Sequence, residues 1–175
     1  LYMTNGFLNV RIDEEFRVLG EDSSALVKVT LEEGRQFRYG EISFTGNGDQ
    51  RTVFHGNKLA DRYTEPGKPI NILDVRRLGF DLKTYLANRG YPYAEIDYHV
   101  DTTGADPRVP ITYSITTDSL VHFGEITVQG TENFPKHVAR RELTFEPGDL
   151  YRRKDLIESQ RRLFESGYFV TVQLR

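Results

Sequence analysis

The stretch "FRYGEISFTG", residues 37–46, decides the fold of this 175-residue chain because it returns as "VHFGEITVQG" at residues 121–130. Gly40 of the first copy corresponds to Gly124 of the second, a separation of 84 residues. A period of this length exceeds the roughly 20–50 residues of a solenoid repeat, whose single unit cannot bury its own apolar face. Each copy can therefore hold a small core.

Two further markers repeat in the same order. "TEPGKPI" at residues 64–70 is answered by "FEPGDLY" at residues 145–151. A third marker occurs three times, as "TNGFLNVRI" from Thr4, "NRGYPYAEI" from Asn88 and "ESGYFVTVQL" from Glu165. The sequence therefore predicts three related units, of which the first and the last are incomplete.

The segments between the markers have helical periodicity. Residues 71–89 and 152–166 carry apolar side chains at spacings of three and four, which predicts one amphipathic helix in each unit. A preceding helix is expected around Val53 to Tyr63, where Gly56 interrupts it, and more clearly at Phe134 to Leu143.

Strands are indicated by alternation of apolar and polar residues. Tyr91 to Asp101 alternates, and so does Val109 to Thr117, with the Gly, Asp and Pro of a hairpin loop between them. Two further strands are expected near Phe7–Arg17 and Ala25–Leu31. In the strand that starts at Tyr91, one face carries Ala94, Ile96, Tyr98 and Val100, and the other carries Tyr93, Glu95, Asp97, His99 and Asp101.

The expected fold class is α+β. Each unit runs strand, helix, helix, strand, strand, and forms a three-stranded mixed sheet of order 1-3-2 that two helices cover on one face. The second strand of each unit then lies at the sheet edge, where Pro92 near its start is tolerated.

This order of elements, the Gly-Glu-Ile strand, the Glu-Pro-Gly turn and the helix that ends in Gly-Tyr-Phe resemble POTRA domains. POTRA domains are periplasmic modules that precede the outer-membrane barrel in the Omp85 superfamily, and "LIESQRRLFESGYFVTVQL", residues 156–174, resembles members of the BamA and TamA kind. The resemblance divides the chain into the end of one unit (1–34), a complete unit (35–119) and a unit that stops before its last strand (120–175).

Several expectations follow from this division. The chain is expected to be a fragment whose targeting signals lie elsewhere, and the parent protein is expected to continue into an outer-membrane β-barrel. The incomplete sheets at the two ends predict strand pairing between chains.

The resemblance also predicts function. An exposed edge strand offers unpaired N–H and C=O groups that an extended peptide can bind with little sequence preference. POTRA domains are expected to capture unfolded outer-membrane proteins in this way and to dock accessory assembly subunits. The predicted peptide-binding strand comprises Tyr93, Ala94, Glu95, Ile96, Asp97, Tyr98, His99 and Val100. The alternative is an edge that the next unit merely covers.

Other classes of function are disfavoured. A net charge of −3 from interleaved acids and bases indicates no nucleic-acid surface. No spacing of nucleophile and base suggests an enzyme, and no cofactor is expected. His99 beside Asp97 is read as a solvated face rather than a metal site, and the glycines in "TGNGDQR", residues 45–51, as a tight turn rather than a phosphate loop.

The repeated glycines are read as structural, with backbone conformations closed to other residues at Gly40, Gly90, Gly124 and Gly167, and with type II turns at Gly67 and Gly148. The full set of structural glycines is Gly40, Gly46, Gly67, Gly90, Gly124, Gly130, Gly148 and Gly167.

Two rival functions stay open: a scaffold that spaces folded partners in a secretion or division complex, and a module of a two-partner secretion transporter with one dedicated substrate.

Overall fold

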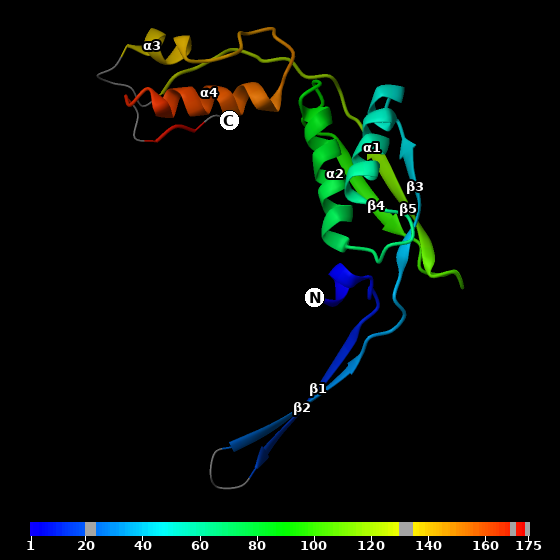
Figure 1. Cartoon of the computed structure of the whole chain (residues 1–175). Coiled ribbons are helices and arrows are strands. Elements are labelled where there is room, and N and C mark those ends of the chain that lie inside the picture. Colours follow the sequence, from blue (N-terminus) through cyan, green and yellow to red (C-terminus); the bar gives the residue numbers. More distant parts are fainter. Residues whose placement is uncertain (20–23, 130–134, 169–170, 174–175) are drawn as a thin grey trace.

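The computed structural model describes residues 1–19, 24–129, 135–168 and 171–173 (Figure 1). The first unit contributes a 3-10 helix, Tyr2–Asn5, and a two-stranded antiparallel hairpin of β1 (Arg11–Leu19) and β2 (Ser24–Glu32). The hairpin projects away from the other units as a long arm. The first strand was expected from Phe7, but the ladder begins at Arg11, and Phe7 makes only an isolated bridge to Gln36.

One face of this hairpin is apolar and exposed. This face carries Ile12, Phe16 and Val29, whose exposed fractions are 62%, 66% and 60%. In the middle unit the corresponding face carries two helices, which have no counterpart on the hairpin among the described residues. The hairpin therefore presents an uncovered sheet face.

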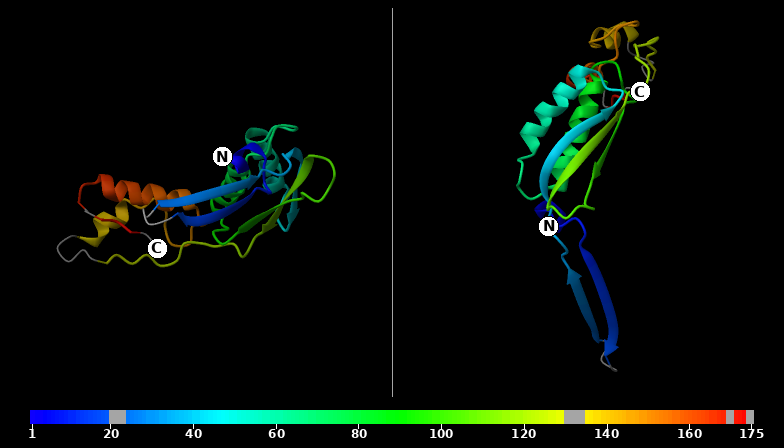
Figure 2. Two further views of the ribbon diagram at one scale, coloured as in Figure 1. Left: turned by 90° about the horizontal axis from the view of Figure 1, so that it is seen from below. Right: turned by 90° about the vertical axis from the view of Figure 1, so that its right-hand side faces the viewer.

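The middle unit has the predicted architecture. Its elements are β3 (Arg38–Gly46), α1 (Gln50–Tyr63), α2 (Ile72–Ala87), β4 (Glu95–Val100) and β5 (Arg108–Thr116). The strand order is β3-β5-β4, with β3 parallel and β4 antiparallel to β5, so the expected mixed sheet of order 1-3-2 is confirmed. Both helices lie on one face of the sheet (Figure 2).

The core of the middle unit lies between α2 and the sheet. Leu78 and Leu82 of α2 have no exposed surface, and Ile111 and Tyr113 meet them from the central strand. The Tyr113 hydroxyl donates a hydrogen bond of 2.8 Å to the Val75 carbonyl. Burial raises the pKa of Tyr113, so this phenol stays a neutral donor.

The predicted weakness of α1 at Gly56 was wrong. The helix is continuous through Gly56 over 14 residues. A Cβ atom at this position would lie 2.7 Å from the ring carbons of Phe44. Gly56 therefore lets the Phe44 ring pack directly against the helix backbone, and this close packing accounts for a residue that helix propensity alone disfavours.

The last unit contains α3 (Lys136–Arg141) and α4 (Arg153–Glu165). The helix expected at Phe134 to Leu143 is therefore only six residues long. The repeated strand expected from Val121 forms no strand over residues 121–129, apart from one bridge between His122 and Leu150.

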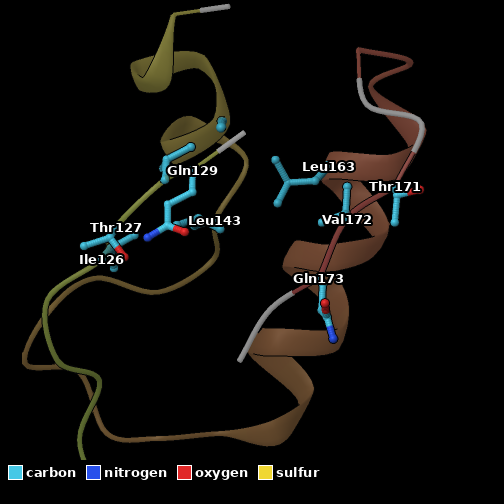
Figure 3. A pocket seen from close by; sticks show the side chains of 10 residues that line it. Ile126, Thr127, Gln129, Leu143, Leu163, Thr171, Val172 and Gln173 are labelled. Atoms are coloured by element: carbon cyan, nitrogen blue, oxygen red, sulfur yellow. The ribbon is translucent and has the colours of Figure 1, made fainter. Parts of the chain in front are cut away.

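The missing strand has a physical cause. In the middle unit β3 pairs with β5 from Arg38 to Gly46, with one register shift between Tyr39 and Ile42, and no described segment takes the place of β5 in the last unit. A cavity of about 150 Å³ lies there instead, between Ile126 on one side and Leu163 and Val172 on the other (Figure 3). Gly130, one of the glycines read as structural, lies outside the described residues.

The repeated glycines differ in conformation. Positive φ angles occur at Gly46, Gly67, Gly90, Gly148 and Gly167, whereas Gly40 and Gly124 have none. The expected backbone restriction is therefore wrong for Gly40 and Gly124. At Gly40 the reason for glycine is a close approach, because a Cβ would lie 2.7 Å from the Val109 carbonyl oxygen, whereas nothing lies within 4 Å at Gly124.

Candidate functional site

The candidate site is the outer edge of β4. Among the residues that the structure describes, this strand pairs with β5 alone, in a register that sets Ile96 opposite Ile115 and Val100 opposite Ile111. The opposite edge of the sheet is different, since the amide of Tyr39 at the start of β3 donates to the Lys68 carbonyl and the Tyr39 carbonyl accepts from the amide of Gly67. The turn at residues 66–69 thus covers part of the β3 edge, whereas no described segment covers the outer backbone edge of β4 in this way.

The register identifies which backbone groups of β4 face outward. The Asp101 amide donates to the carbonyl of Pro110, its direct partner, at 3.1 Å. Because bonded and non-bonded pairs alternate along an antiparallel ladder, the odd-numbered residues of β4 direct their backbone groups toward β5. The N–H and C=O groups of Ile96, Tyr98 and Val100 therefore point to the free edge.

Two of the predicted site residues lie outside the strand. Tyr93 and Ala94 precede β4, and the Ala94 amide donates to the carbonyl of Tyr91 at 3.3 Å, which is a turn contact. Alternation alone could not detect this turn, because Ala94 is fully buried and Tyr93 is 69% exposed, as they would be in a strand. The edge strand itself therefore begins at Glu95.

The side chains of β4 divide as the alternation indicated. Glu95, Asp97 and His99 are exposed, whereas Ile96 and Tyr98 pack against the core beneath the helices. The Tyr98 hydroxyl accepts a hydrogen bond from Arg76 Nε of α2 at 3.3 Å. A strand added at this edge would meet a polar and partly acidic row on the face that the helices leave uncovered.

The end of the candidate edge is held by local hydrogen bonds. The Asp101 carboxylate accepts from the hydroxyl and the amide of Thr103, at 2.6 and 3.0 Å, and these bonds lower the pKa of Asp101. Arg35 donates to the carbonyls of Gly104 and Ala105 in the loop that connects β4 to β5. Sequence analysis missed Arg35, since no repeat or periodicity marks this position.

The glycine loop that resembled a phosphate loop has a structural explanation. In the loop at residues 45–51, Asn47 pairs with the backbone of Thr117 and Asp49 caps α1 by accepting from the Thr52 amide at 2.8 Å. Within the described residues, no group of three or more His, Asp or Glu side chains gathers in metal-binding geometry. No helix in the described part of the chain is both long and apolar enough to cross a bilayer.

Comparisons with known proteins agree on the family. The family model named POTRA, described as surface antigen variable number repeat, matches residues 37–118 and 121–175. The outer membrane protein assembly factor BamA of Neisseria meningitidis is 25% identical over 173 residues, which are 98% of this chain and 22% of that protein. BamA of Neorickettsia risticii is also 25% identical, over 99% of this chain and 23% of its own length. The chain thus spans about a fifth of these relatives.

Solved structures show the same fold. The crystal structure of Haemophilus influenzae BamA POTRA3-5 superposes with a TM-score of 0.78 at 20% identity, over 99% of this chain and 68% of that one. BamA of Haemophilus ducreyi lacking POTRA domains 1-3 gives a TM-score of 0.69 at 19% identity, over 79% of this chain and 26% of that one.

Proposed function

Because this chain belongs to the POTRA family, we propose that it is a periplasmic, non-catalytic segment of an outer-membrane protein assembly factor, which captures unfolded β-barrel clients by strand addition to β4. The relatives named above as BamA assembly factors support the role in assembly. The parent protein would continue into an outer-membrane β-barrel and would dock accessory assembly subunits.

The free edge of β4 is the observation that carries the proposal. Three consecutive outward-facing residues, Ile96, Tyr98 and Val100, offer pairs of N–H and C=O groups on a strand that Tyr113 and the other core residues hold in place. An incoming strand satisfies these groups whatever its side chains are, which suits a module that binds many β-rich clients. The exposed Glu95 and Asp97 would favour clients with a basic or polar residue opposite them.

The experiment is an NMR titration of the chain with an extended peptide from an outer-membrane barrel strand. We expect amide shifts to be largest at Ile96, Tyr98 and Val100 and smaller at the odd-numbered residues between them, whose amides face β5. The Ile96→Pro substitution removes one outward donor, and we expect it to weaken the peptide affinity several-fold.

The matched control is Ile96→Ala, which loses the same apolar packing but keeps the outward N–H. If Ile96→Ala weakens binding as much as Ile96→Pro does, the backbone edge is not the binding site. If no amide shifts at millimolar peptide, the scaffold function, in which the units hold folded partners at fixed positions, is the better account.

Strand pairing between chains stays a prediction. The uncovered apolar face of the β1–β2 hairpin, with Phe16 66% exposed, favours association of chains by packing of that face, which is separate from pairing of strand edges. Light scattering over a range of protein concentrations would distinguish a monomer from an assembly formed in this way.

A further inference from the structure

The middle and last units meet at a joint formed by residues 88–93, 120–123 and 150–154. One hydrogen bond of this joint repeats between the first and middle units. The Phe37 amide donates to the Gly6 carbonyl at 2.7 Å, and 84 residues later the Val121 amide donates to the Gly90 carbonyl at 2.8 Å. Both glycines have positive φ. The chain therefore enters each new unit through the same backbone contact.

The second joint has an additional contact that the first one lacks. In the middle unit, α2 is capped by its own Asn71, whose side-chain oxygen accepts from the Leu73 amide at 3.0 Å. The corresponding cap residue of α4 is Arg152, which makes no side-chain cap hydrogen bond. The Lys154 amide donates instead to Asn88 Oδ1 of the middle unit at 2.8 Å.

Asn88 can fix the orientation of α4 relative to α2 because its own backbone is held at the end of α2. It is the C-terminal cap of that helix, and its amide donates to the Leu86 and Thr84 carbonyls. Its side chain thus joins the C-terminal end of α2 to the N-terminal end of α4. The dipoles of the two helix ends are complementary at this contact.

Two further contacts cross the same joint. The guanidinium of Arg153, in the first turn of α4, lies 5.9 Å from the ring centroid of Phe80 on α2. At Gly90, a Cβ atom would lie 2.6 Å from Leu150 and 2.7 Å from Leu120, so these side chains pack directly on the glycine backbone. The joint is therefore built from apolar, polar and charged contacts together.

We propose that Asn88 is a positioning residue that caps α4 across the joint and thereby locks the last unit in one orientation on the middle unit. The locked joint holds Pro92 and Tyr93 opposite Phe123 and Tyr151, around a cleft of about 870 Å³. This inference concerns the arrangement of the units and stands whether or not β4 binds clients.

Distance measurement by pulsed electron paramagnetic resonance tests the proposal. The chain has no cysteine, so labels can be attached at Asp61→Cys on α1 and Ile157→Cys on α4, two exposed sites away from the joint. We expect one narrow distance distribution in the otherwise unchanged protein. In the Asn88→Ala variant we expect the distribution to become at least twofold broader.

Two variants separate positioning from helix stability. Asn71→Ala removes the cap of α2 within one unit, and we expect it to leave the width unchanged. Adding Arg152→Asn to Asn88→Ala gives α4 a cap from its own unit, and we expect recovery of helix content by circular dichroism while the distribution stays broad. The proposal is overturned if Asn88→Ala leaves the width unchanged, if Asn71→Ala broadens it equally, or if Arg152→Asn restores it.

Discussion

Replacement of Gly79 by alanine should stabilise the middle unit. Gly79 lies buried in the interior of α2, and a Cβ atom there would lie 3.7 Å from both Ile96 Cγ2 and Tyr113 Cε1, which is ordinary van der Waals contact. Alanine in a helix interior is favoured over glycine by about 1 kcal/mol. Burial of one added methyl group contributes at most about 0.8 kcal/mol more. We expect Gly79→Ala to raise the free energy of unfolding by about 1 kcal/mol or slightly more.

The same substitution at Gly56 should have the opposite sign. The new Cβ would lie 2.7 Å from the Phe44 ring, which cannot retreat easily because it stacks on Tyr113 with centroids 5.4 Å apart. Overpacking of this kind costs about 1–3 kcal/mol, and the helix-propensity gain of about 1 kcal/mol offsets only part of it. We expect Gly56→Ala to lower the free energy of unfolding by about 1 kcal/mol.

Urea unfolding followed by circular dichroism measures both effects. Equal m-values in the two variants and the parent chain would show that the same surface is exposed on unfolding. A destabilising Gly79→Ala would refute the reasoning, because it would mean that α2 lies closer to the sheet than the 3.7 Å contacts indicate. A stabilising Gly56→Ala would equally contradict the packing of Phe44 against α1.

Two other predictions concern single hydrogen bonds. Tyr113→Phe removes the 2.8 Å bond to the Val75 carbonyl and should cost about 1 kcal/mol in urea unfolding; no loss would show that this buried bond adds nothing. Asp49 accepts from the hydroxyl and amide of Thr52, which lower its pKa, so its stabilisation is present at neutral pH and is lost as the pH falls through that lowered pKa. Asp49→Ala should therefore cost about 1 kcal/mol at pH 7, and unfolding curves near pH 3 should show a smaller difference; a gap that does not depend on pH would contradict this assignment.

The repeat and the alternation predicted most of the middle unit. The spacing of apolar residues over 71–89 predicted α2, and the alternation around Ile96 and Tyr98 assigned both faces of the edge strand correctly. These features are local in sequence, since an apolar period of two or 3.6 residues directly reflects which side of a strand or helix is buried. Alternation did not reveal that Tyr93 and Ala94 form a turn, because a turn residue can be buried or exposed in the same pattern.

The details that the sequence missed depend on neighbours that are distant along the chain. A glycine stands inside α1 at position 56 because Phe44 packs against the helix backbone there, and residues 121–129 form no strand because a strand requires a bonded partner. In the sequence, nothing distinguishes Asn88 from other residues at helix ends. In the structure, its side chain accepts a hydrogen bond from the amide of Lys154, which is 66 residues away. The sequence by itself determined the order of elements in the middle unit and the faces of its edge strand, because local periodicity encodes burial. Only the tertiary structure decided which backbone groups of the edge strand face outward and which residues join the units, because hydrogen-bond partners across a fold produce no periodic pattern in the chain.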